Sequence, residues 1–179
     1  VDGQTAVHIA CEGNSRIAMK LLQLPASRDV KDSGGRVPIQ RLPCLASEKM
    51  AHERTQADRV WSEVLLRCAL DAGHSPNPAP HFYGRSVLHD AVLHGDVAVA
   101  KLLIARRANI EAIDDDHLTP LGLACIDKAE SGRCLDLLLE SGANVEKICI
   151  NFEGNGSDFT GISTACEFGN EKAVRALIA

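Results

Sequence analysis

The sequence predicts an all-α fold built as a solenoid, in which short helix-turn-helix units stack one after another. Two observations lead to this prediction. One eight-residue phrase returns along the chain in altered spellings, and the copies are followed by a second run of apolar residues at helical spacing. Self-similarity at a fixed period is typical of stacked-repeat proteins, in which each unit buries its apolar face against its neighbours.

The recurring phrase defines the repeat unit. Its copies stand at Gly3–Ala10, Gly84–Ala91, His117–Ala124 and Asp158–Ala165, with a degenerate copy at Gly35–Gln40. Counted from the threonine position of the phrase, at residues 5, 37, 86, 119 and 160, the steps are 32, 49, 33 and 41 residues. The basic unit is therefore near 33 residues, and the longer steps mark insertions.

Each phrase predicts a first short helix, and the apolar run after it predicts a second. At Thr119-Pro120 the threonine oxygen can cap free N–H groups, and proline fits the first turn of a helix. The turn between the helices and the end of the second helix both need residues that accept a positive φ angle. The residues expected there are Gly95, Gly169 and Asn14 in the turns, and Ala108-Asn109 and Gly142 after the second helix.

With these residues in register, the chain resembles the ankyrin-repeat family. The family pattern Gly-x-Thr-Pro-Leu-His-x-Ala-Ala-x-x-Gly, with a Leu-Leu-x-x-Gly-Ala ending, is matched best by residues 84–116 and 117–157. The resemblance covers essentially the whole chain. It implies an ankyrin-repeat solenoid with β-hairpin-like fingers, whose partners bind a concave face made of finger tips and first helices. It indicates the fold more strongly than the function, because stacked ankyrin units serve many unrelated partners.

The repeat frame divides the chain into five units. We expect unit 1 at 1–34, a degenerate unit 2 at 35–83 with a helical insertion at about 44–63, unit 3 at 84–116, unit 4 at 117–157 with an extended finger, and a partial unit 5 at 158–179. Pro43 should end or kink the first helix of unit 2, which makes unit 2 the expected weak joint of the stack. We interpret the chain as a fragment of a longer protein.

The insertion is the most individual segment. Residues 44–72 contain no glycine or proline, and oppositely charged residues four apart support an exposed helix. These pairs are Lys49–Glu53, Arg54–Asp58 and Arg59–Glu63. The expected apolar face consists of Ala57, Val60 or Trp61, Val64, Leu65 and Cys68. We predict that the second helix of unit 2 is extended at its start and projects from the stack; the alternative is a disordered loop at 47–58.

Cysteine usage points to a reducing compartment. The chain has seven cysteines and no Cys-x-x-Cys pair, which argues against a disulfide framework and a zinc site. Cys11, Cys125 and Cys166 share one repeat position with Val92, so we expect all three to be small buried groups. Free buried thiols favour the cytoplasm or nucleus.

Composition and motifs argue against several functions. The net charge is −5 with both signs mixed, which disfavours nucleic acid as a partner, and no run of 18 apolar residues predicts a membrane span. The chain has no phosphate-binding loop, no Gly-x-Ser-x-Gly and no His-Glu-x-x-His, so we expect no enzymatic activity and no cofactor or metal. The resemblance implies that His8 and His89 join neighbouring units through hydrogen bonds.

One group of candidate partner-binding residues follows the small buried residue of each first helix, where we expect the helix end to be exposed. The group is Leu93 and His94, Ile126 and Asp127, and Glu167 and Phe168. Leu93, Ile126 and Phe168 would form an apolar stripe across three units, as interaction sites often do. The alternative is that each of them leans into the neighbouring unit.

A second group lies on the fingers. It consists of Tyr83, Arg85, Asp114, Asp115, Asp116 and His117. The acidic run suits a basic peptide through electrostatic steering, and the alternative is a solvated hairpin end. Tyr83 is either a contact residue or packs under its loop, and the same alternatives apply to Phe152 and Phe159 in the extended finger.

The sequence therefore predicts a non-catalytic protein-protein interaction module that binds a partner protein or peptide on its concave face or insertion. The alternative is a regulatory or targeting ankyrin segment of a larger enzyme, such as an acyltransferase or kinase. A third possibility is that the units brace a neighbouring domain.

Overall fold

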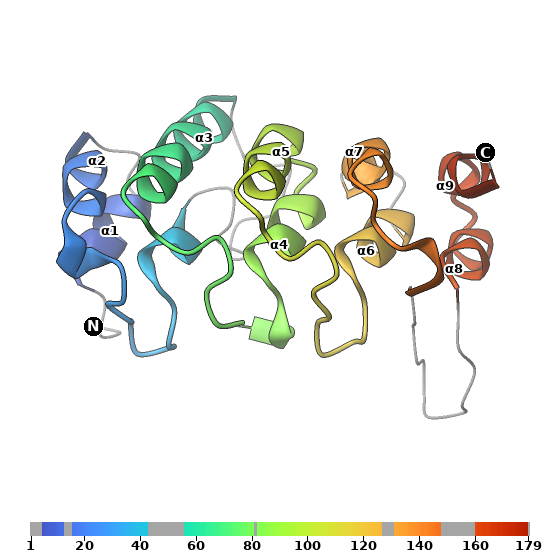
Figure 1. The fold of residues 1–179 in the computed structure, drawn as a ribbon, viewed down its shortest axis with the longest axis horizontal. Coiled ribbons are helices and arrows are strands. Elements are labelled where there is room, and N and C mark those ends of the chain that lie inside the picture. Colours follow the sequence, from blue (N-terminus) through green and yellow to red (C-terminus); the bar gives the residue numbers. More distant parts are fainter. Residues whose placement is uncertain are drawn as a thin grey trace.

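A computed structural model describes residues 5–12, 16–42, 56–80, 82–126, 131–147 and 160–178. Within these ranges the fold is helical and contains no β-strand. Pairs of helices stand side by side in a row, and the fingers project from one side of it (Figure 1). The predicted all-α solenoid is confirmed.

The helices form two layers. The first layer contains α1 (Ala6–Glu12), η2 (Pro38–Arg41), α4 (Val87–Leu93), α6 (Pro120–Ile126) and α8 (Gly161–Glu167). The second layer contains α2 (Arg16–Leu22), α3 (Gln56–Asp71), α5 (Val97–Ala105), α7 (Leu135–Glu140) and α9 (Glu171–Ile178). Short 3-10 turns connect them: η1 (Pro25–Ser27), η4 (Phe82–Gly84), η5 (Ser131–Cys134) and η6 (Val145–Lys147).

Successive units pack layer against layer. In the first layer α1 contacts η2, α4 contacts α6, and α6 contacts α8; in the second layer α2, α3 and α5 are consecutive neighbours. The buried leucines, alanines and valines of both layers make one continuous core. Ala91, Ala124 and Ala165 share one repeat position and are fully buried, because the first helices approach each other closely there.

Local hydrogen bonds explain where the helices begin. The Ser86 hydroxyl accepts from the His89 N–H at 3.3 Å, and the Thr119 hydroxyl accepts from the Gly122 N–H at 3.1 Å. Pro120 is the first residue of α6, as predicted. These caps satisfy donors that have no partner inside a helix.

The turns between helices are confirmed where the structure describes them. Gly95 and Gly169 have φ angles of 60° and 62°, and Asn14 lies outside the described residues. The residue after each glycine caps the second helix: Asp96 accepts from the Val99 N–H at 3.2 Å, and Asn170 accepts from the Ala173 N–H at 3.1 Å.

One prediction about helix ends is wrong. After α5 the positive φ angle belongs to Arg107, at 65°, and not to Ala108 or Asn109. Gly73 and Gly142 take the equivalent position after α3 and α7, with φ angles of 90° and 81°. The Arg107 N–H still donates to the Ile104 carbonyl at 2.9 Å, so the turn forms without glycine.

Unit 2 keeps the frame with different elements. The four-residue turn η2 occupies the place of a first helix and ends just before Leu42 and Pro43. Helix α3, with 16 residues, takes the place of a second helix and covers residues 56–63 of the predicted insertion. The rest of the predicted insertion, at 44–55, lies outside the described residues. It contains the pair Lys49–Glu53 and the arginine of the pair Arg54–Asp58.

The predicted apolar face of α3 is partly wrong. Leu65 is fully buried, but Val60 and Val64 are 52% and 38% exposed. The buried side of α3 instead runs through Ser62, Leu65, Leu66, Ala69 and Leu70. This side of α3 is covered because it faces α2 and α5 at once, and a single-helix pattern does not show which turns have two neighbours.

The cysteine prediction holds at two of its three positions. Cys11 and Cys125 are fully buried, as is Val92 at the same repeat position. Cys166 is exposed, and the prediction of a buried thiol there is wrong. Cys166 lies on α8, which packs against α6, η6 and α9. No described helix follows α9 to cover the other side of α8.

Candidate interaction site

Two histidines clamp neighbouring units, as the resemblance implied. His8 accepts from the Thr5 hydroxyl at 2.9 Å through Nδ1, and its Nε2 donates to the Arg36 carbonyl of the next finger at 2.9 Å. His89 repeats this arrangement with Ser86 and with the Leu118 carbonyl at 3.1 Å. Burial lowers the pKa of His89, which keeps the ring in the neutral form that can donate and accept at once.

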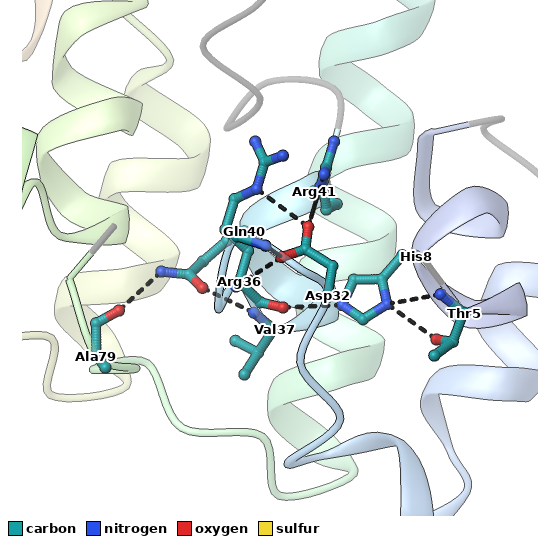
Figure 2. Close-up of polar contacts among 9 residues, drawn as sticks. Thr5, His8, Asp32, Arg36, Val37, Gln40, Arg41 and Ala79 are labelled. Carbon is teal, nitrogen blue, oxygen red and sulfur yellow. Dashed lines mark hydrogen bonds and ion pairs between the residues drawn. The ribbon is translucent and has the colours of Figure 1, made fainter. Parts of the chain in front are cut away.

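Unit 2 has a glutamine where these units have histidine. The Gln40 side chain accepts from the Val37 N–H at 2.9 Å and donates to the Ala79 carbonyl at 3.0 Å (Figure 2). The amide group therefore makes both bonds of the histidine clamp, one within its unit and one to the next finger. The sequence reading missed this role because the copy of the phrase in unit 2 is degenerate.

A buried ionic cluster supports the same turn. Asp32 accepts from Arg36 Nε at 3.1 Å and from Arg41 Nη2 at 2.6 Å, and all three side chains are less than 10% exposed (Figure 2). Burial alone would raise the pKa of Asp32, but the hydrogen bonds and charges of Arg41 and Arg36 outweigh it and lower this pKa to about 2. The carboxylate is therefore charged at neutral pH.

Asp32 and Asp114 shape two fingers in the same way. Asp32 Oδ1 accepts from the Gly34 and Arg36 N–H groups, both at 2.9 Å. Asp114 Oδ1 accepts from the Asp116 N–H at 3.0 Å and from the Leu118 N–H at 2.8 Å. Asp114 is only 4% exposed. Its expected place in an exposed acidic tip is therefore wrong, because the finger needs its carboxylate to bind backbone donors.

The remaining finger residues come together where the fingers at the ends of units 2 and 3 meet. The Asp115 N–H donates to the Tyr83 carbonyl at 2.9 Å. Arg85 lies 3.8 Å from Asp114 through Nε, and its guanidinium carbon is 5.3 Å from the centre of the Tyr83 ring. We call Tyr83, Arg85, Asp115, Asp116 and His117 the tip cluster.

The tip cluster presents an aromatic ring to solvent. Tyr83 is 66% exposed and has a φ angle of 57°, followed by Gly84 at 66°. Two consecutive positive φ angles turn the backbone sharply, and the ring does not pack under its loop. Asp115, Asp116 and His117 are exposed as well, so the cluster combines a ring with two solvated carboxylates.

The helix-end group is less uniform than expected. Leu93 and Ile126 are half-buried, Ile126 packs against the core, and Phe168 is 37% exposed. Glu167 is exposed, whereas His94 is 6% exposed, so the expected exposure of His94 is wrong. Its N–H continues the helix by donating to the Asp90 carbonyl at 3.1 Å. Asp127, and the finger with Phe152 and Phe159, lie outside the described residues.

Family comparison agrees with the repeat frame. A model described as ankyrin repeats, in three copies, matches residues 62–149, and a single ankyrin-repeat model matches residues 2–33. The chain belongs to the ankyrin-repeat family. The matched residues include His8, His89, the tip cluster and residues 62–71 of α3.

The chain is similar to segments of much longer ankyrin-repeat proteins. SH3 and multiple ankyrin repeat domains protein 2 of Homo sapiens is 28% identical over 146 residues, which are 70% of this chain and 8% of that protein. Inversin of Mus musculus is 31% identical and inversin of Gallus gallus 32% identical, each over 137 residues, 75% of this chain and 11% of inversin. The chain therefore spans about a tenth of the length of these relatives.

Two features are absent from the described part of the ankyrin repeats. No helix in it is long and apolar enough to cross a membrane. Nor does it bring together three or more histidine, cysteine or acidic side chains that could hold a metal ion.

Proposed function

We propose that these ankyrin repeats are a non-catalytic protein-protein interaction module, whose partner docks a basic segment on the tip cluster. The observation that carries the proposal is the exposed ring of Tyr83 beside the solvated carboxylates of Asp115 and Asp116. One relative, whose name includes multiple ankyrin repeat domains, supports a module within a longer protein.

The tip cluster suits a cationic partner for two reasons. One face of the Tyr83 ring already holds the Arg85 guanidinium, and cations bind aromatic faces with about 0.5–2 kcal/mol. Asp115 and Asp116 add negative charge that attracts a lysine or arginine and speeds association at low salt. Tyrosine is also enriched among the residues that contribute most to binding energy.

The tip cluster is preferred over the helix-end group because its members are more accessible. Leu93 and Ile126 are half-buried, so little of either side chain is left for a partner. Phe168 keeps 37% of its surface and would extend the contact along the concave face. The fingers and first helices then act as one surface.

The test is an affinity capture from native cell extract with the intact chain, a Tyr83→Ala variant and an Ile17→Ala control. Ile17 is 63% exposed on α2, so the control removes a similarly exposed apolar side chain on the other layer. We expect a protein that the wild-type chain and the control retain and that Tyr83→Ala retains at least about tenfold less. Raising the salt concentration should weaken that capture, since steering is screened.

Equal retention by Tyr83→Ala and wild type would move the site away from the tip cluster. An Asp115→Asn/Asp116→Asn variant separates the two contributions, because it keeps the ring and removes the charge. The absence of any specific capture would favour units that brace a neighbouring domain.

A second candidate function is that of a regulatory or targeting ankyrin segment in a larger enzyme. The small share of each relative that the chain spans favours it. The tip cluster would then bind a segment of the same polypeptide. Comparison of capture by the isolated repeats and by the full gene product would separate the two functions.

We place the module in the cytoplasm or nucleus. The described cysteines Cys11, Cys68, Cys125, Cys134 and Cys166 are all free. Burial raises the pKa of both Cys125 and Cys134 to about 12, so these thiols stay protonated and unreactive. Core thiols that need no oxidation fit a reducing compartment.

A further inference from the structure

A pocket separates the first finger from the segment that follows α3. Its volume is about 470 Å³, and its polar walls are Arg28, Asp29, Lys31 and His74. Val37, Ile39 and Pro78 add an apolar side. No residue of the tip cluster contributes to it, so its chemistry is independent of that surface.

Arg28 is an exposed residue of the pocket wall and has no anionic partner among the described residues. A Cβ atom on Gly73 would lie 3.1–3.4 Å from Cζ, Nη1 and Nη2 of Arg28, so the guanidinium rests against the glycine backbone. Within the part of the chain that the structure describes, neither Arg28 nor Lys31 forms an ion pair or a side-chain hydrogen bond. Asp29 is the single carboxylate of the walls, which leaves one net positive charge when His74 is neutral.

His74 supplies an unused hydrogen-bond acceptor. Its Nε2 donates to the Leu22 carbonyl at 3.0 Å and lies 3.2 Å from the Ser27 hydroxyl. The ring is 4% exposed, and its Nδ1 is buried without a hydrogen-bond partner. Because Nε2 carries the proton, Nδ1 has a free lone pair that needs an N–H or O–H donor. Burial lowers the pKa of His74, which favours this neutral ring.

The three features fit one ligand. A guanidinium matches the two oxygens of a carboxylate, and one carboxylate balances the net charge of the walls. A peptide also has N–H groups for His74 Nδ1 and aliphatic side chains for Val37, Ile39 and Pro78. We propose that this pocket binds a peptide through a carboxylate held by Arg28 and Lys31. This inference rests on the proposed function in one respect only, namely that the peptide belongs to a partner polypeptide.

A direct titration tests the pocket with the isotope-labelled chain of 179 residues and three synthetic peptides. They are acetyl-Ala-Val-Glu-Val-Ala-amide, the same peptide with glutamine, and acetyl-Ala-Val-Val with a free C-terminal carboxylate. We expect the glutamate peptide to shift the Gly73 and Ser75 amide signals and the His74 ring signals in NMR spectra. The glutamine peptide should bind at least about tenfold more weakly. The third peptide decides whether a side-chain or a C-terminal carboxylate is preferred.

Two variants complete the experiment. Arg28→Gln should weaken binding of the glutamate peptide at least about tenfold. Lys20→Gln removes an equal charge from the exposed surface of α2 and should change the affinity little. Equal binding of the glutamate and glutamine peptides would overturn the proposal, as would wild-type affinity in a folded Arg28→Gln variant. Because the titration involves neither Tyr83 nor cell extract, its failure and the failure of the proposed function are distinguishable.

Discussion

Positive φ angles mark places where the backbone turns within and between units, and glycine holds most of them among the described residues. The described glycines with this geometry are Gly35, Gly73, Gly84, Gly95, Gly142 and Gly169. Tyr83, Arg107 and His117 also have positive φ angles. For a residue with a Cβ atom, this conformation raises the free energy of the folded state by about 1 kcal/mol or more. Two of these three belong to the tip cluster, so its shape depends on strained residues.

Gly84 and Gly142 provide a matched test of this geometry. Their φ angles are 66° and 81°, and a Cβ atom would meet the Asp115 N at 2.9 Å from Gly84 but nothing within 4 Å from Gly142. We expect Gly142→Ala to lower the free energy of unfolding by about 1 kcal/mol through φ alone. Gly84→Ala should lower it by about 1–3 kcal/mol more, because Asp115 must move. Urea denaturation followed by circular dichroism measures both, and equal losses would contradict the close approach of the two fingers.

At the scale of elements, unit 2 shows how a helix can be replaced by polar contacts. Its first-layer element is the short turn η2, which makes few internal backbone hydrogen bonds. Gln40 links this turn to the Ala79 carbonyl, and Arg41 links it to Asp32. A buried charge that loses its partner is strongly destabilising, so these links should matter more than exposed ion pairs do.

Acid should loosen this turn. The pKa of Asp32 falls from its ordinary 3.8 to about 2 on folding. A lowered pKa means that the unfolded chain binds the proton more readily, so the stabilisation is fully present above about pH 4 and is lost as the pH falls through 2. It amounts to about 2 kcal/mol. Unfolding free energies measured between pH 5 and pH 2 should therefore decline more steeply for wild type than for Asp32→Asn.

The control for acid unfolding is Asp116→Asn, which removes an exposed carboxylate of the tip cluster. It should keep the slope of wild type over the same pH range. Buried His74 and His89 add a separate decline below their ordinary pKa of 6.5, because both have lowered pKa values and resist protonation. If the unfolding free energy of Asp32→Asn fell as steeply as that of wild type between pH 5 and pH 2, the proposed role of the Asp32–Arg36–Arg41 cluster would be contradicted.

Over the whole molecule, stability is approximately a sum of unit terms and contacts between neighbours. Units 3 to 5 each contain a first-layer α-helix, whereas unit 2 has only η2. Helix α3 bridges α2 and α5 in the second layer, and it keeps the two ends of the stack joined. Unit 2 thus meets unit 1 in both layers and is joined to unit 3 mainly through the second layer.

This predicts unequal opening along the stack. Hydrogen exchange of backbone amides should be at least about tenfold faster in α1 and α2 than in α4, α5 and α6, corresponding to about 1.4 kcal/mol less protection. The comparison of Leu22 with Leu103 is a fair one, since both are fully buried in second-layer helices. Uniform protection across the units, with one cooperative transition, would contradict a weak joint.

The repeat phrase made much of this fold predictable, because its interactions are local and recur. Thr119 capped its helix and Gly95 turned the chain as expected, since both effects depend on neighbours within a few residues. His94 and Asp114 were expected on the surface and are buried. Their environment depends on the adjacent unit, and the spacing within one copy of the phrase does not report how deeply that unit covers them.

The sequence by itself determined the period, the two-helix unit, the histidine clamps and the family, because each is written in residues close together or repeated in register. Tertiary structure alone decided which residues meet across units. Gln40 reaches Ala79, 39 residues away, and Tyr83 meets Asp115 on the next finger. Arg28 and His74 share a pocket in the same way. Insertions and degenerate turns change the number of residues between these groups, and only the stacking of the units brings the groups together.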